Sequence, residues 1–175
     1  KSKAKRNKLI SNLSIENPIL FEEYLAAKSV AEKNSLFLLQ SQLYPLTGKG
    51  DVNTYTVFAE GFRMKISKRG RAGIITPTGI ATDDLTKDFF RSIVETKQLV
   101  SLYDFENRKK LFNGVDSRFK FCLLTLNGSE NFVPFDFLFF GLEPNDLLDE
   151  NRHFSLTKEE LLELNPNTGN CPIFR

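Results

Sequence analysis

The stretch "GRAGIITPTGIATDDLTKDFFRSIVETKQLVSLYDFE", residues 70–106, decides the fold class of this chain. Its early part, "AGIITP" (72–77), and its last part, "LVSLYDFE" (99–106), are short apolar runs typical of strands buried in a parallel sheet. Between them, "TDDLTKDFFRSIVETK" (82–97) is predicted to be a helix, with Thr82 or Asp83 as its cap and acids in its first turn that favour the helix dipole. One helix between two strands predicts a right-handed crossover, which makes the two strands parallel.

A third strand is predicted at "RFKFCLLTL" (118–126). The link before it, residues 107–117, is rich in turn-forming residues and too short for a second crossover helix. The chain is therefore expected to turn back, so that the third strand runs antiparallel to the second. Three segments then meet at one edge of the sheet: residues 77–82, residues 106–116 and the start of the third strand.

The residues before this stretch favour helices, which makes the whole an α/β chain. A helix is predicted over residues 17–42, with Asn17 as its cap and Pro18 in its first turn. A second helix is predicted over residues 53–70, with Gly70 as its stop.

The residues after the third strand have a different composition. "NFVPFDFLFFGL" (131–142) is strand-like and rich in Phe, and "SLTKEELLEL" (155–164) reads as a short helix. In that helix, Thr157 and Glu160 have the spacing of a capping box. We expect residues 129–175 to be a connector that leads out of the domain.

Charge divides unevenly along the chain. Residues 1–129 carry 21 Lys/Arg and 13 Asp/Glu, whereas residues 130–175 carry 3 and 9. A basic body suits a polyanionic partner, although ordinary surface scatter gives the same asymmetry.

The composition is that of an ordinary soluble globular protein, with 41% hydrophobic and 26% charged residues. No apolar run approaches the roughly 18 residues of a membrane helix, and the basic start lacks the apolar core of a signal peptide. We therefore expect a cytoplasmic location and no membrane contact. Cys122 is expected to be a buried free thiol, and His153, the only histidine, a surface loop residue. No metal site is predicted.

The sequence offers no complete catalytic or phosphate-binding motif. "LTGKG" is not a phosphate loop, because Leu43 stands where the first glycine belongs and no Ser or Thr follows Lys49. A single histidine gives no credible Ser-His-Asp or Cys-His arrangement. The predicted edge does carry a basic and aromatic group: Arg108, Lys109, Lys110, Phe112, Arg118 and Phe119. Such a group suits a nucleic-acid strand or an unstacked base, but composition alone favours a solvated turn with Phe112 tucked into the core.

From about residue 8 to residue 175 the chain resembles the second half of an adenine-specific DNA methyltransferase, in particular the restriction–modification enzymes that fuse methyltransferase and nuclease. The matching stretches are "YPLTGKGDVNTYTVFAE", "GRAGIITPTGIATDDLTKDFF", "LVSLYDFENRKKLFNGVDSRFKFCLLTL" and "LNPNTGNCPIFR". The resemblance implies a Rossmann-like sheet that binds S-adenosylmethionine. Residues 72–77 then resemble its fifth strand, 99–105 its sixth, and 118–126 an antiparallel seventh strand that lies between those two.

The resemblance also implies roles for residues at the predicted edge. Enzymes of this family flip the target adenine out of double-stranded DNA, and an aromatic residue before the seventh strand stacks on it. Phe112 occupies that place, and the loop of Pro77, Thr78 and Gly79 is expected to be one wall of the base pocket. The expected contacts to DNA phosphates are Arg108, Lys109, Lys110 and Arg118. Residues 1–128 then correspond to the C-terminal half of the catalytic domain, and residues 129–175 lead into a target-recognition region.

Two motifs of the family are missing from this sequence. The Gly-rich cofactor loop is absent, and so is the catalytic Asn/Asp-Pro-Pro-aromatic motif, because "NPIL" at Asn17 lacks the second proline and the aromatic residue. Both are expected upstream of Lys1, in the rest of the same polypeptide. The chain alone is therefore expected neither to methylate DNA nor to bind S-adenosylmethionine measurably. Two alternatives stay open: a non-catalytic DNA-binding or specificity module on the same scaffold, and an α/β interaction domain without a nucleic-acid role.

Overall fold

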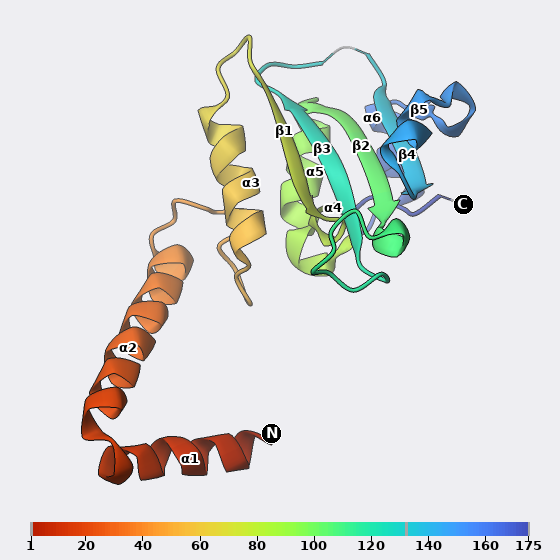
Figure 1. Cartoon of the computed structure of the whole chain (residues 1–175). Coiled ribbons are helices and arrows are strands. Elements are labelled where there is room, and N and C mark those ends of the chain that lie inside the picture. The colour runs from red at the N-terminus through yellow and green to blue at the C-terminus, as the bar shows by residue number, and fades with distance from the viewer. Residues whose placement is uncertain (1, 132, 175) are drawn as a thin grey trace. The chain divides into compact units, whose positions relative to one another are not determined.

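The computed structural model describes residues 2–131 and 133–174. The chain divides into two compact units, residues 1–43 and residues 44–175 (Figure 1). The larger unit contains the sheet and every residue predicted above to serve a site.

The first unit consists of two helices, α1 (Lys3–Glu16) and α2 (Pro18–Gln40). The start of α2 is as predicted, because the Asn17 side chain accepts a hydrogen bond from the Leu20 backbone N–H at 3.1 Å. Pro18 stands in the first turn, where its missing N–H has no helical partner to lose.

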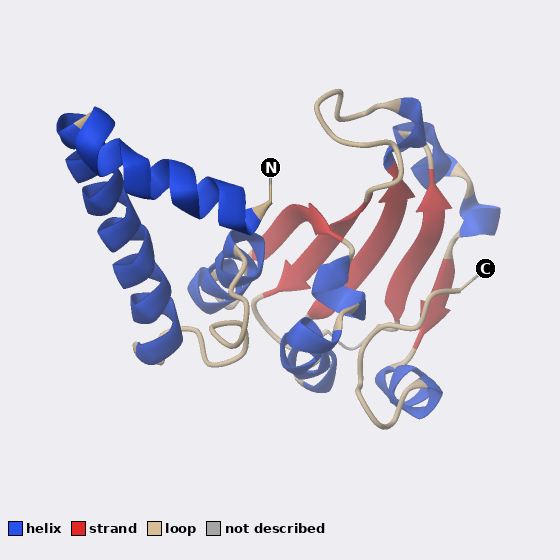
Figure 2. Ribbon diagram, turned by 90° about the horizontal axis from the view of Figure 1, so that it is seen from below, coloured by secondary structure: helices blue, strands red, loops and turns tan. Residues whose placement is uncertain are grey.

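The second unit is a mixed five-stranded sheet flanked by helices (Figures 1 and 2). Its strands lie in the order β1-β3-β2-β4-β5. The elements in chain order are α3 (Thr54–Lys65), β1 (Arg71–Pro77), α4 (Gly79–Thr82), α5 (Lys87–Glu95), β2 (Leu99–Glu106), β3 (Lys120–Asn127), β4 (Phe135–Gly141), β5 (Phe154–Leu156) and α6 (Lys158–Leu164).

The predicted arrangement of the first three strands is confirmed. Strand β3 lies between β1 and β2 and pairs antiparallel with both, with Thr76 opposite Cys122 and Asp104 opposite Cys122 in the two ladders. Strands β1 and β2 therefore run parallel to each other. The buried face of α5, formed by Phe89, Phe90, Ile93 and Val94, packs into the core beneath them.

The helix predicted over residues 82–97 is divided in two. Asp83 is extended and separates α4 from a 3₁₀ turn (Asp84–Thr86) that leads into α5. The Gly79 carbonyl accepts the last α4 hydrogen bond from the Asp83 N–H at 3.0 Å, and the Thr86 hydroxyl donates to the same carbonyl at 2.6 Å and to the Asp83 carbonyl at 3.1 Å. The predicted cap at Thr82 or Asp83 was therefore wrong for α5, which begins at Lys87 and has Thr86 at its N-cap position.

Two further expectations were wrong. Strand β1 is an edge strand rather than a buried one: among the described residues it pairs only with β3, and Ile75 is 60% exposed. Helix α3 ends at Lys65, and Ile66 is already extended, so Gly70 does not stop it. Gly70 instead lies just before β1, where its carbonyl accepts from the Gly128 N–H at 3.0 Å.

The Phe-rich residues after β3 extend the same sheet. Strand β4 pairs parallel with β2, and β5 pairs antiparallel with β4. The compact unit runs on to residue 175 without a division near residue 128. In α6 the predicted capping box is confirmed, because Thr157 and Glu160 each accept a hydrogen bond from the other's backbone N–H.

Cys122 is a buried free thiol, as predicted, and Cys171 is another. Burial raises the pKa of Cys122 to about 12. His153 lies on a loop, as predicted, but it is only partly exposed and its ring has partners: Nδ1 is 3.0 Å from Asp136 Oδ2 and Nε2 is 3.2 Å from the Leu147 carbonyl. Within residues 2–131 and 133–174, no helix is long and apolar enough to span a bilayer.

Gly128 follows β3 at a point where the backbone leaves no room for a side chain. A Cβ there would overlap the carbonyl oxygen of Ser67, in the turn between α3 and β1. Gly128→Ala is therefore expected to lower the free energy of unfolding by about 1–3 kcal/mol, because the backbone must shift. Gly73→Ala is the matched control, since nothing lies within 4 Å of its new Cβ. Denaturant unfolding measures both, and equal stabilities would contradict this close approach.

Candidate functional site

The carboxyl ends of β1 and β2 and the start of β3 meet at one edge of the sheet, as predicted. Thr78 follows β1, Asp104 lies near the end of β2, and Lys120 begins β3. The Thr78 hydroxyl donates to Asp104 Oδ1 at 2.6 Å, and the Lys120 ammonium lies 3.2 Å from Asp104 Oδ2. In open α/β sheets this edge is where ligands usually bind.

Asp104 is the centre of this edge and is fully buried. Besides Thr78 and Lys120, it accepts a hydrogen bond from the Phe140 backbone N–H at 3.4 Å. A buried carboxylate is stable only where such partners replace the water it has lost. Asp104 is thus fully engaged within the fold, and its role here is to join three strands rather than to meet a ligand.

Phe140 lies in a distortion of β4. The pairing with β2 slips between Leu138 and Gly141, and Phe140 has a left-handed backbone with φ of 57°. This conformation is uncommon for a bulky residue and occurs where surrounding contacts enforce it. It places the Phe140 ring under the Lys120 ammonium, 3.8 Å from the ring centroid.

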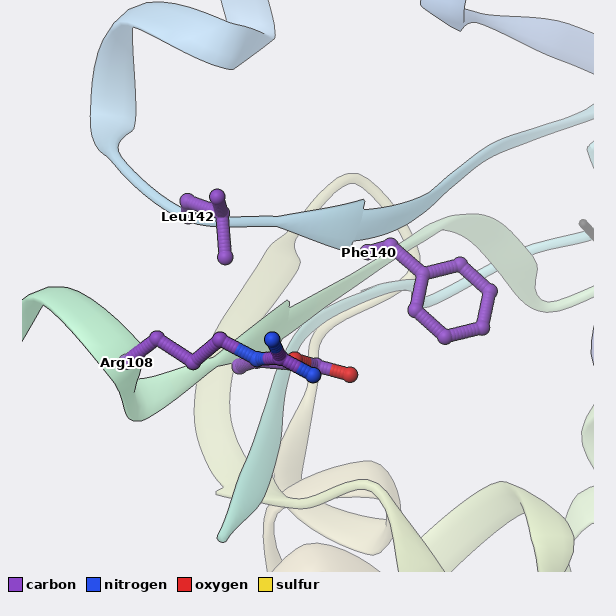
Figure 3. Close-up of a pocket in the computed structure, with 4 residues that line it drawn as sticks. Arg108, Phe140 and Leu142 are labelled. Atoms are coloured by element: carbon purple, nitrogen blue, oxygen red, sulfur yellow. The ribbon is translucent and has the colours of Figure 1, made fainter. Parts of the chain in front are cut away.

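A shallow open pocket of about 370 Å³ lies beside this cluster, lined by Glu106, Arg108, Phe140 and Leu142 (Figure 3). The Arg108 guanidinium forms an ion pair with Glu106, and Figure 3 shows the Arg108 side chain reaching toward the Phe140 ring. A second hollow of about 300 Å³ is lined by Glu106, Arg108, Ser117 and Arg118. Carboxylate, guanidinium and ring together can hydrogen-bond and stack a planar polar group.

Phe112, the predicted stacking residue, lies on the loop between β2 and β3 and is 40% exposed. Its ring meets Phe121 edge to face, with centroids 5.0 Å apart. It lines neither of the two hollows described above. The residue is thus neither in the core nor at the pocket, but on the surface of the same sheet edge.

The four predicted phosphate contacts all have partners within the protein. Arg108 pairs with Glu106, and Lys109 pairs with Glu143 at 2.8 Å. The Lys110 ammonium donates to the Val115 carbonyl at 3.1 Å.

Arg118 forms an ion pair with Asp116 at 3.0 Å, and hydrogen bonds from Arg118 hold the pKa of the Asp116 carboxyl below its usual value. The guanidinium itself stays largely in solvent. Surface pairs of this kind contribute little energy, so a phosphate can replace the acid.

The loop expected to form a pocket wall is only partly available to a ligand. Pro77 is exposed, whereas Thr78 is buried with its hydroxyl committed to Asp104. The space beside Gly79 is filled by the Asp83 carboxylate, which a Cβ at this position would overlap. The glycine therefore serves the turn into α4 and makes no cradle for a ligand.

Sequence reasoning missed Asp104, Glu106, Lys120 and Phe140. The signal for the first was available: an acid inside the apolar run "LVSLYDFE" must find partners if the strand is buried. In the parts of the chain that the structure describes, no group of three or more His, Cys, Asp or Glu side chains could hold a metal ion.

The chain matches no family model, and it matches no curated protein sequence. A function for this chain is therefore inferred from the geometry of the sheet edge together with the resemblance described above.

Proposed function

We propose that this chain is part of an adenine-specific DNA methyltransferase of a restriction–modification system, acting on double-stranded DNA in the cytoplasm. The role of this chain in that enzyme is to hold the flipped adenine and to contact the DNA backbone. The observation that supports this most is the reversed strand β3 inserted between the parallel strands β1 and β2. The resemblance implies this order for the fifth, seventh and sixth strands of a Rossmann-like methyltransferase sheet.

The position of Phe112 supports the same function. An aromatic side chain that is 40% exposed lies on the loop that leads into the reversed strand, at the carboxyl edge of the sheet. A flipped base must find an aromatic face to replace the stacking it had in the duplex. An exposed ring at this edge offers such a face, whereas a core ring would not.

The cofactor and the catalytic motif are proposed to belong to the rest of the polypeptide. S-adenosylmethionine would supply the methyl group. In support of this, Asp83 fills the space beside Gly79, and Asp104 is already engaged by three partners within the fold. What this chain contributes is therefore binding and orientation of the DNA.

The basic residues of the edge provide the test. A variant with Arg108, Lys109, Lys110 and Arg118 changed to Gln is expected to bind all DNA sequences more weakly. The plot of log affinity against log salt should flatten by about 0.9 for each DNA phosphate that the variant no longer neutralises. Fluorescence anisotropy with labelled duplexes over a range of salt concentrations measures both.

Arg91→Gln is the matched control, because Arg91 is also exposed and paired, with Glu95 at 2.8 Å. It is expected to leave the salt dependence unchanged. Loss of affinity for one DNA sequence only would mean that the four residues read bases. DNA binding without any methylation by the longer protein would favour the specificity module, and no DNA binding would favour the interaction domain.

A further inference from the structure

Asn107, the first residue after β2, is fully buried although it begins a surface loop. Its backbone N–H donates to the Phe119 carbonyl at 3.0 Å, and its carbonyl accepts from the Lys110 N–H at 2.9 Å. The first bond joins the two ends of the loop that carries Phe112, and the second closes the turn at its start. A buried amide at such a point needs a full set of partners.

The Asn107 side chain finds those partners on Phe112 itself. Its Nδ2 donates to the Phe112 carbonyl at 2.9 Å and to the Val115 carbonyl at 3.0 Å. Its Oδ1 accepts from the Phe112 N–H at 2.9 Å. One amide thus binds the N–H and the C=O of Phe112 and the C=O of Val115, which requires two donors and an acceptor. Among side chains of this size only Asn supplies that combination.

The loop benefits from this restraint because its apolar side chains are poorly buried and contribute little to its order. Four of its apolar residues remain at least 40% exposed: Leu111, Phe112, Val115 and Phe119. A loop without buried apolar contacts samples many conformations, and ordering it on binding lowers affinity. Asn107 fixes the Phe112 backbone before any ligand binds. The Phe112 ring contacts Phe121 edge to face, and the residue stays 40% exposed to solvent.

We propose that Asn107 is the positioning residue that presents Phe112 to an unpaired base. This inference rests on the proposed function, because it takes Phe112 to be the stacking residue. Asn107 touches no base itself. It acts by holding the Phe112 backbone in the conformation that binding requires, which is preorganisation of a contact residue by its supporting shell.

A double-mutant cycle on the whole chain tests the proposal. The variants are Asn107→Ala, Phe112→Ala and both together, and the probes are a duplex with one unpaired 2-aminopurine and the same duplex fully paired. Asn107→Ala is expected to weaken binding to the unpaired probe about tenfold with little effect on the paired one. The two changes should be non-additive, because each removes the same stacking interaction. In these variants, the change in 2-aminopurine emission that accompanies binding should disappear together with the preference for the unpaired probe.

Matched controls separate positioning from folding. Asn165→Ala removes a similar amide from another loop, where Asn165 Nδ2 donates to Asn170 Oδ1 at 2.9 Å, and should leave the preference for the unpaired probe intact. Asn107→Ser, whose hydroxyl can serve only part of the set, provides a milder variant if the Ala variant does not fold. Selective weakening by Ser, in a protein with an intact thermal transition, supports the proposal.

The outcomes distinguish the positioning role of Asn107 from the stacking role of Phe112 on which it rests. If Phe112→Ala abolishes the preference for the unpaired probe and the folded Asn107 variants keep it, the positioning role is wrong and the stacking role stands. If Phe112→Ala leaves the preference unchanged, the proposed function fails and the positioning role fails with it. Additive effects of the two changes would also overturn the positioning role.

Discussion

Asp104→Ala is expected to lower the free energy of unfolding by about 2–4 kcal/mol, the range for breaking one side of a buried charge pair that is partly open to water. The substitution removes the acceptor of the buried Thr78 hydroxyl, 2.6 Å away, and leaves that donor without its partner. It also takes from Lys120 its nearest acid, although Glu106 remains at 3.8 Å. Because three strands meet at this carboxylate, the destabilisation should appear as one cooperative shift in urea unfolding.

Asp84→Ala provides the comparison. Asp84 is also paired with a lysine, Lys87 at 2.8 Å, but its side chain is exposed, so its removal should scarcely move the unfolding midpoint. Asp104→Asn should fall between the two, because it can still accept from Thr78 but cannot neutralise Lys120. Unfolding of Asp104→Ala at the wild-type midpoint would show that the carboxylate only occupies space.

The central part of the fold could be predicted because local signals agreed with one another. The helix of α5 between two apolar runs required a parallel pair, and the short link after β2 required a reversal at β3. Both inferences use only chain connectivity, which a sequence states directly. Connectivity does not show where a helix is interrupted, and the break at the extended residue Asp83, between α4 and the 3₁₀ turn before α5, was not predicted.

Strand pairing beyond those neighbours was not predictable in the same way. The run "AGIITP" is as apolar as a buried strand, yet β1 lies at the edge of the described sheet. An apolar composition shows that a strand can be buried, but it does not show whether a neighbouring strand or helix covers it. The Phe-rich run at β4 was recognised as a strand, but its pairing with β2 joins residues far apart in sequence.

The sequence predicted where the site lies, at one edge of the sheet, but it did not predict which side chains contact one another there. Link lengths brought the three segments together, and the loop residue Phe112 is exposed there. The partners of the charged residues could not be foreseen, because Lys109 meets Glu143 from the connector and Lys120 meets a phenylalanine ring. The buried acids Asp104 and Glu60 accept hydrogen bonds from residues distant in the sequence, Thr78 and Thr47, so these partners are seen only in the structure.

Phe112→Ala is expected to weaken capture of a flipped adenine, or to slow methyl transfer in the longer protein, by roughly ten- to a hundredfold. Stacking of a base on an aromatic side chain contributes about 1–3 kcal/mol, and each 1.4 kcal/mol is about a factor of ten. Phe112→Trp should be milder because it keeps an aromatic face. Single-turnover methylation and binding to duplexes with an unpaired adenine measure the two effects.

The rival explanation is that Phe112→Ala merely loosens the fold by removing the packing against Phe121. Phe112 is 40% exposed and meets that ring edge-on, so we expect only a small change in melting temperature. Phe119→Ala is the matched control, since Phe119 is an exposed aromatic residue at the other end of the same loop. If melting, binding and methylation are all unchanged in Phe112→Ala, Phe112 neither stacks on a base nor supports the core. If Phe119→Ala weakens binding to the same extent, the effect belongs to the apolar loop as a whole rather than to one stacking residue.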